Sequence, residues 1–291
     1  MATLRDIRRR IRSRQKTMQI TSAMRMVSAA KLRRAQDAIL AARPFAMEIW
    51  ATMYDLGRRQ PDLEHPLLKP HAAKRSIEFV VVTSDRGLCG AFNTNVLKAA
   101  QAEIAKRGAE FEQVSLATVG RKGSDFFRRR RPPEKSWLIG NRADPELARD
   151  IAQHVASRYE SGAVDEVVFV GSEFVSALTQ QPQAIRVLPL VPEASRARSY
   201  EEGAGTEPFS IEPDPQQLLG ALVPLALQFS VYRALLESQA GEHAARMTAM
   251  ESATRNAEEL IQSLTLQFNR ARQAVITKEL VEIVSGAEAL A

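Results

Sequence analysis

Two glycine turns are the places in this sequence where chemistry is first to be expected. Residues 85–90 and residues 120–123 each follow a β-branched apolar run. Amides exposed at such a turn, where a helix begins, attract phosphate. Neither turn contains G-x-x-x-x-G-K-[ST] or G-x-G-x-x-G, so the backbone cradle and the phosphate-reaching lysine are missing. Arg121 and Lys122 are the residues that would contact phosphate, but we expect no nucleotide or other cofactor here.

No group of side chains has the pattern of a catalytic or metal site. The four histidines are scattered without ligand spacing, and no carboxylates cluster with them in a way that suits acid–base catalysis. No nucleophile-elbow sequence occurs. The only cysteine, Cys89, excludes an internal disulfide and a multi-cysteine metal site. We therefore predict no catalytic residue, no metal and no enzyme activity of the chain alone.

The elements that carry these turns alternate along the middle of the chain. Apolar runs predict strands at 77–82, 114–119, 167–170 and 185–189, and helices are expected over 95–106, near Ser124 and over 144–160. Asp144 is a good N-cap before Pro145. The alternation predicts a Rossmann-like α/β domain with a mostly parallel sheet. Residues 128–131 are expected to be a solvated loop, and residues 195–215 a flexible return.

Both ends of the chain favour long helices. Of the 28 glycines and prolines, 25 lie between Gly57 and Pro224, so segments 3–56 and 225–285 are almost free of them. As helices they would span about 80 and about 90 Å. The economical arrangement is an antiparallel coiled-coil hairpin on a globular base. The predicted domains are residues 1–57 (first helix), 58–212 (α/β domain) and 213–291 (second helix).

The C-terminal segment has the spacing of a coiled-coil seam. Its apolar or small positions mostly recur at steps of three and four, with one extra four-residue step between Leu264 and Phe268 that is typical of a stutter. These positions are Met250, Ala253, Ala257, Leu260, Leu264, Phe268, Ala271 and Val275. On the N-terminal segment, Leu4, Ile7, Ile11 and Met18 are followed by Ile20, Met24 and Val27, which drift to another phase. Two separate core helices of a larger bundle are the alternative.

The positive charge is concentrated in one arm. Residues 1–34 carry eleven Arg or Lys and one Asp, a balance of +10, so the other residues sum to 6 − 10 = −4. Such an arm can bind nucleic acid, an anionic membrane or an acidic protein surface, or can simply be a solvated helix face. No aromatic residue precedes Phe45, which weakens the first two alternatives. The longest apolar stretch, 218–232, is interrupted, so we expect a soluble chain.

Three segments resemble the gamma subunit of F-type ATP synthases. They are ITSAMRMVSAAKLR at 20–33, TSDRGLCGAFN at 83–93 and NRARQAVITKEL at 269–280. The resemblance covers the whole chain in the same order, and the two terminal motifs are long and specific.

The resemblance implies a non-catalytic central-stalk rotor. In that family the paired terminal helices pass up the centre of a ring of three alpha and three beta subunits. The α/β domain forms a foot that rests, with epsilon, on the membrane-embedded c-subunit ring. Proton flow turns the foot, and the shaft drives ATP synthesis at the beta subunits; hydrolysis runs the linkage backwards. The implied location is the cytoplasmic face of a bacterial inner membrane, with membrane contact only through the c ring and no nucleic acid partner.

The resemblance also assigns residues to contacts. Met24 and Arg25 match the segment that meets the beta lever, which is acidic in that family. The contact cluster on the facing helix corresponds to Arg246, Gln273, Thr277 and Glu279. Phe209 and Glu212 match the foot motif near the c ring. Ile211 stands where an aromatic residue is common, which makes the foot contact at Ile211 less certain.

Two other functions stay open from the residues alone. A basic coiled-coil protein that binds nucleic acid or acts as a scaffold would explain the arginines, and its duplex affinity would fall steeply with salt. A small-molecule α/β enzyme would explain the middle domain. Co-purification of alpha and beta subunits from native membranes distinguishes these readings from a rotor.

Overall fold

The computed structural model describes residues 3–177, 179–190 and 214–288, which form two compact units. The helical unit comprises the described parts of residues 1–28 and 246–291, and the sheet unit those of residues 29–245. The predicted boundaries at 57 and 212 were placed at the ends of the two expected long helices. The two units are instead divided by which residues pack together, so each long helix contributes to both units. Residues 195–213 of the predicted return, with Phe209 and Glu212, lie outside the described residues.

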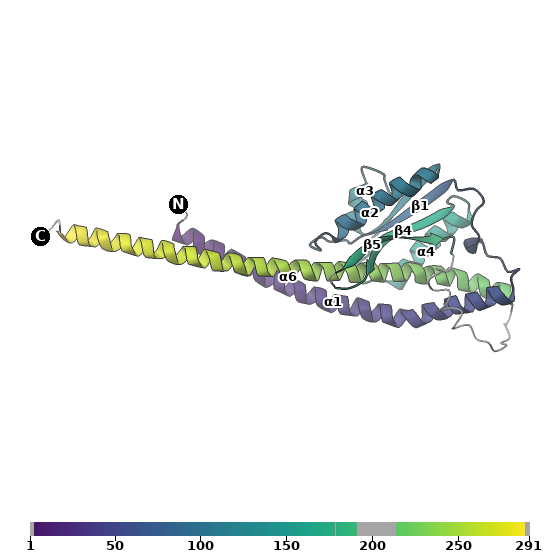
Figure 1. Ribbon diagram of the computed structural model, residues 1–291, viewed down its shortest axis with the longest axis horizontal. Helices are drawn as coiled ribbons and strands as arrows, with labels where there is room; N and C mark the ends of the chain where they lie inside the picture. The colour runs from purple at the N-terminus through teal and green to yellow at the C-terminus, as the bar shows by residue number, and fades with distance from the viewer. Residues whose placement is uncertain (1–2, 178, 191–213, 289–291) are drawn as a thin grey trace. The chain divides into compact units, whose positions relative to one another are not determined.

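Two long helices open and close the chain. Helix α1 is Leu4–Arg59 and helix α6 is Pro215–Glu288 (Figure 1). Each contains an internal proline, Pro44 or Pro224. A proline inside a helix costs about 3 kcal/mol, and the segment almost free of glycine and proline began at residue 225, after Pro224. Helix α6 starts ten residues earlier, near the predicted domain boundary, because the segment before Pro224 buries an apolar face in the core, which includes Leu219 and Val223.

Helix α6 starts where a side-chain cap satisfies its first turn. The carboxylate of Asp214 accepts from the backbone N–H of Gln217 at 3.1 Å, and Pro215 takes the first helical position. The same pair of residues starts α4 (Pro145–Glu160), where Asp144 accepts from the N–H of Glu146 at 3.1 Å as expected. An aspartate followed by a proline therefore marks the start of both α4 and α6.

The sheet unit contains five strands in the order β3-β2-β1-β4-β5. Strands β1 (Ser76–Val82), β2 (Gln113–Val119), β3 (Lys135–Trp137) and β4 (Glu166–Phe174) are parallel, and β5 (Gln180–Leu188) pairs antiparallel with β4. The α/β fold class with a mostly parallel sheet and two long terminal helices is confirmed. The edge strand β3 was missed because three residues give no apolar run to detect.

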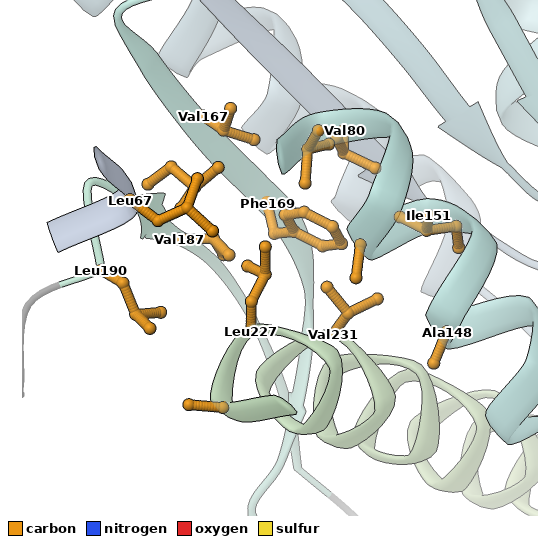
Figure 2. Packing of buried hydrophobic residues seen from close by; sticks show 14 of the residues in the cluster. Leu67, Val80, Ala148, Ile151, Val167, Phe169, Val187, Leu190, Leu227 and Val231 are labelled. Carbon is orange, nitrogen blue, oxygen red and sulfur yellow. The ribbon is translucent and has the colours of Figure 1, made fainter. Parts of the chain in front are cut away.

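One face of the sheet is covered by α4 and by the parts of α1 and α6 that belong to the sheet unit. Figure 2 shows the ring of Phe169, on β4, pointing toward Leu227 and Val231 of α6 and toward Ile151 of α4. From α1, Ile49, Met53 and Leu56 join this core. The long helices are therefore fastened to the sheet by apolar burial at their chain-internal ends.

The other face carries α2 (Phe92–Arg107) and α3 (Arg121–Phe127). The side chains of Ile77, Phe79 and Val81 point to this face from β1, and they pack with Val96 and Ala100 of α2. Every residue of β1 is buried, as expected for a central strand covered on both faces. Short 3-10 turns at Pro66–Leu68 and Gly108–Glu110 complete the unit.

Candidate partner-binding helices

The helical unit is built on a heptad seam between α1 and α6. On α6 a series of less exposed positions follows steps of four and three without interruption: Met250, Thr254, Ala257, Ile261, Leu264, Phe268 and Ala271. Ala253, which was predicted as a seam position, is also half-buried. Across the seam, the hydroxyls of Thr21 and Thr254 share a hydrogen bond of 2.7 Å. The guanidinium of Arg8 lies over the ring of Phe268, 5.3 Å from its centroid. These two contacts set the antiparallel register.

Part of the predicted seam was wrong. Leu260 is 46 % exposed and Ile261 is half-buried in its place, so no stutter exists between Leu264 and Phe268. On α1, Ile20 and Val27 are 61 and 55 % exposed, whereas Thr21 and Ser28 are buried. The heptad of α1 thus continues through polar residues, whose hydroxyls also bond backbone carbonyls of their own helix. The predicted seam of α1 changed its helical phase because only apolar residues were counted as seam positions.

The first turns of α1 are basic and accessible. Thr3 and Asp6 cap the helix reciprocally, since the Thr3 hydroxyl donates to the Asp6 carboxylate at 2.8 Å and the Asp6 N–H donates to that hydroxyl at 3.3 Å. The pKa of Asp6 is lowered by the hydroxyl of Thr3, and next by its backbone N–H, since both donate to the carboxylate. All the arginines and the lysine between residues 5 and 16 are exposed. This face therefore presents positive charge to a partner or to solvent.

Helix α6 continues well past the start of α1. Arg8 meets Phe268 only four residues after Leu4, whereas α6 runs a further twenty residues to Glu288. This difference of about sixteen residues corresponds to about 24 Å of single helix, and Figure 1 shows the same overhang. All residues from 272 to 285, here called the α6 extension, are exposed.

The α6 extension is apolar to an unusual degree for an exposed helix. Ile276, Leu280 and Ile283 recur at i, i+4 and i+7, which places them on one face. Their exposed fractions are 47, 57 and 68 %. Contiguous exposed apolar surface marks an interaction site. Val275, predicted as part of the seam, belongs to this extension and is 41 % exposed.

The residues predicted to contact the alpha and beta subunits all belong to the helical unit, but they differ in how exposed their side chains are. Gln273, Thr277 and Glu279 are exposed on the α6 extension. Arg25 is exposed on α1 and Met24 is half-buried. Arg246 begins the C-terminal part of the unit and is only 9 % exposed. Their contacts with other subunits stay a prediction.

The turn at residues 120–123 has no free amides for phosphate. At the start of α3, Arg121 N–H donates to the Asp85 carboxylate at 3.0 Å and Lys122 N–H to the carbonyl of Ser84 at 3.1 Å. The N–H of Gly123 donates to the Thr83 hydroxyl at 2.8 Å. The helix terminus that would cradle a phosphate is thus occupied by the chain's own acceptors.

The turn at residues 84–93 is held by a buried polar network. The Ser84 hydroxyl donates to the carbonyl of Arg86 at 2.6 Å, and the Asn93 amide donates to the Ser84 oxygen at 2.8 Å and to the Cys89 sulfur at 3.2 Å. Cys89 is 1 % exposed. The residues of this motif therefore fix the shape of the turn. Within the described part of the chain, no three His, Cys, Asp or Glu side chains gather as a metal site.

Among the described helices, α6 is long and apolar enough over Pro215–Ser285 to cross a membrane, by length and composition only. Core helices of soluble proteins pass the same test. Between Leu219 and Leu236 its apolar side chains are packed in the sheet unit, which accounts for part of that apolar character.

Comparison with known proteins points to one family. A family model described as ATP synthase matches residues 3–290. The chain is 51 % identical to the ATP synthase gamma chain of Anaeromyxobacter sp. (strain Fw109-5) and 47 % identical to that of Heliobacterium modesticaldum, and each alignment covers 100 % of both chains.

Solved structures agree with the sequence relatives. The central stalk of the Tetrahymena thermophila mitochondrial ATP synthase, in a structure that includes the c-ring, is 27 % identical with a TM-score of 0.58, over 80 % of this chain and 99 % of that one. A chain of the Euglena gracilis mitochondrial ATP synthase, 20 % identical, shares the fold with a TM-score of 0.65 over 99 % of this chain and 94 % of that one. This chain belongs to the ATP synthase gamma-chain family, as a subunit of the F-type central stalk.

Proposed function

We propose that this chain is the non-catalytic rotor shaft through which proton flow across the membrane is coupled to ATP synthesis or hydrolysis. Three alpha and three beta subunits would surround the helical unit. The alternation of the three catalytic sites would follow from symmetry, because one asymmetric shaft presents a different face to each of three equivalent subunits. Each beta subunit is then biased toward a different nucleotide state.

The observation that carries this proposal is the α6 extension. A helix that leaves its antiparallel partner and exposes Ile276, Leu280 and Ile283 has an apolar face that other chains must cover. A collar of surrounding subunits would enclose it on all sides. Gln273, Thr277 and Glu279, exposed on the same extension, would make polar contacts that form in one rotary position and break in the next.

The basic face of α1 would supply a second kind of contact. Its arginines are exposed, and the beta lever is the acidic partner that the family resemblance implies. Arg25 would be a direct charge contact, and Met24 would lie beside it. Arg246 is buried at the start of the C-terminal part of the unit. We infer that Arg246, from this buried position, holds the contact surface in place.

The foot would be formed by the α/β domain with the segment that carries Phe209 and Glu212, meeting the c ring and epsilon. The solved Tetrahymena thermophila structure, which contains a central stalk and a c-ring, supports this partner. Attachment to the cytoplasmic face of a bacterial membrane would then be indirect, through the ring. The occupied start of α3 supports a shaft that has no nucleotide site of its own.

The test is reconstitution of the purified chain with alpha and beta subunits from the same organism. The chain alone is expected to show no ATPase activity, which should appear only when alpha and beta are present. Calorimetry of the chain alone should show no ATP binding. Micromolar ATP binding by the isolated chain would overturn the non-catalytic assignment. Failure of alpha and beta to co-purify with it from native membranes, together with salt-sensitive binding to duplex DNA, would instead support the nucleic-acid alternative.

A further inference from the structure

A carboxylate is buried in the middle of the central strand. The side chain of Glu78, on β1, is 0 % exposed, and it lies on the face of the sheet covered by α4. Its register neighbours on the adjacent strands are Ser115 and Val167, neither of which carries charge. A buried carboxylate is costly unless it is paired or protonated.

Helix α4 supplies the groups that meet this carboxylate. The Arg158 Nε lies 3.1 Å from Glu78 Oε2, and the His154 Nε2 lies 3.4 Å from Oε1. Because they are four residues apart, these two side chains share one face of the helix. Arg158 also forms an ion pair with Glu134, which precedes β3, and donates to the Ser115 hydroxyl at 3.3 Å.

The other charges nearby are already paired with each other. Asp150, one turn before His154 on α4, accepts from Trp137 Nε1 at 2.6 Å and from Lys135 Nζ at 3.1 Å. The Trp137 ring meets the His154 ring edge to face, with centroids 5.3 Å apart. Lys135 and Asp150 therefore carry opposite charges that pair with each other, and they also act in opposite directions on the pKa of His154, which Lys135 lowers and Asp150 raises.

The charge count of that cluster is not balanced. Glu78 and Glu134 together carry two negative charges against the one positive charge of Arg158, so with a neutral His154 the cluster has a net charge of −1. One added proton makes it neutral. Burial favours the neutral form at Glu78, whose side chain is 0 % exposed, whereas the charge of Glu134, 45 % exposed, is partly screened by solvent. Glu78 Oε1 and His154 Nε2 face each other and provide the place for that proton.

We propose that Glu78, His154, Arg158 and Glu134 form a proton-binding site, which holds one proton while α4 is packed on the sheet and releases it when that packing opens. The ligand of this site is a single proton. The site does not depend on the proposed rotor function, since all four residues belong to the sheet unit.

The direction of the titration agrees with this geometry. Burial, which outweighs the attraction of Arg158, raises the pKa of Glu78 from 4.5 to about 7. Burial, followed by the charges of Lys135 and Arg158, lowers the pKa of His154, so the shared proton belongs mainly to the carboxyl. When α4 opens, Glu78 returns to its ordinary pKa and the proton is lost at any pH between these values.

The sign of the pH effect follows by linkage. Between pH 4.5 and about 7 the packed state binds more protons than the open state. Raising the pH in this window therefore favours opening, by up to about tenfold per pH unit for one proton. Below pH 4.5 both states hold the proton, above about 7 neither does, and the effect is flat in both ranges.

The test compares the full-length chain with its Glu78→Gln variant by hydrogen exchange of the α4 amides, corrected for the intrinsic exchange rate. Glutamine keeps the shape and cannot titrate, so the ratio of opening constants, parent over variant, isolates Glu78 from all other groups. This ratio is expected to rise with pH up to about 7 and then level off. A ratio that does not change with pH overturns the proposal.

Two further variants make the result specific. Glu166→Gln is the matched control, because Glu166 is also buried in the sheet and is paired with one arginine, Arg107, away from the Glu78 cluster. It should retain the pH dependence of the parent. Glu134→Gln removes one negative charge from the cluster, so the window should move to lower pH. If Glu78→Gln fails to fold, the comparison is between the parent and Glu134→Gln. The proposal is then overturned if opening of α4 increases over the same pH range in both.

Discussion

The hydroxyls of Thr21 and Thr254 meet at 2.7 Å across the seam of the helical unit, at positions where a coiled coil ordinarily places apolar side chains. Because a hydroxyl carries a single proton, one threonine donates to the other, and the one that accepts donates its own proton to a carbonyl of its own helix, Met18 for Thr21 or Met250 for Thr254. Neither hydroxyl is left unsatisfied. The pair therefore sets the register of the two helices without the cost of an unpaired buried polar group.

Replacing this pair tests its role in register. Thr21→Val or Thr254→Val alone should lower the free energy of unfolding by about 0.5 to 1.5 kcal/mol, because one hydroxyl loses its cross-helix partner. The double variant should lose less than the sum, since valine pairs pack well in a seam. The measurement is urea unfolding followed by helical circular dichroism. Thr265→Val is the control, because exposed Thr265 bonds the Ile261 carbonyl of its own helix, at 2.7 Å. Additive effects of Thr21→Val and Thr254→Val would contradict the coupling.

Gly120 is required where β2 gives way to α3. Its φ is +92°, and a Cβ there would lie 2.2 Å from the carbonyl oxygen of Thr83. Gly120→Ala should therefore destabilise the chain by more than about 3 kcal/mol in a thermal or denaturant melt. Gly162→Ala is the matched control, with a φ of +72° but no atom within 4 Å of the added Cβ. It should cost only about 1 to 2 kcal/mol, and equal losses at the two sites would show that the close approach to Thr83 does not matter.

The apolar stripe of the α6 extension is expected to lie in an apolar sleeve of the assembled complex. Leu280→Ser with Ile283→Ser should leave the isolated chain folded, because both side chains are exposed in it. Assembly with alpha and beta should weaken by at least tenfold, since burial of each such side chain contributes about 1.5 to 3 kcal/mol. Quantitative pull-down measures this.

The control for the stripe is Leu266→Ser, which removes a leucine that is 61 % exposed but lies where α1 runs beside α6. It should assemble like the parent. If the double variant at Leu280 and Ile283 assembles equally well and produces the same torque, the extension is not a bearing.

Gln273 and Thr277 are expected to carry state-specific hydrogen bonds with the ring. Replacing both by alanine should preserve the helix, because alanine favours it. It should lower ATPase activity and coupled proton pumping of the reconstituted complex by one to three orders of magnitude, if several hydrogen bonds of one rotary state are lost. Ser263→Ala with Gln267→Ala is the control, four residues apart and exposed on the two-helix stretch. Turnover equal to the parent at matched assembly would show that Gln273 and Thr277 carry no step of the cycle.

Much of the fold could be predicted from the sequence because the signals are local. The apolar runs located β1, β2, β4 and the end of β5, the scarcity of glycine and proline located α1 and α6, and Asp144-Pro145 located the start of α4. The family motifs identified the subunit. Motif residues 83–93 were recognised without knowing that Ser84, Asn93 and Cys89 form a buried network.

Tertiary structure alone decided which of two neighbouring residues faces inward. Leu260 and Ile261 are equally good seam residues by composition, and the choice depends on the register with α1, which Thr21 and Thr254 help to set. The start of α6 likewise depended on core burial of Leu219 and Val223, which outweighs the penalty of Pro224. Local rules see the proline but not the core.

Glu78 shows the same division most clearly. The sequence determined that residues 77–82 form a strand, and one charged residue in an apolar run did not alter that. Its partners, His154 and Arg158, lie 76 and 80 positions later in the chain, on a helix that only the packing of α4 against the sheet brings within reach. Short-range spacing determines secondary structure, whereas charge pairing in a core depends on distances that exist only after the chain has folded.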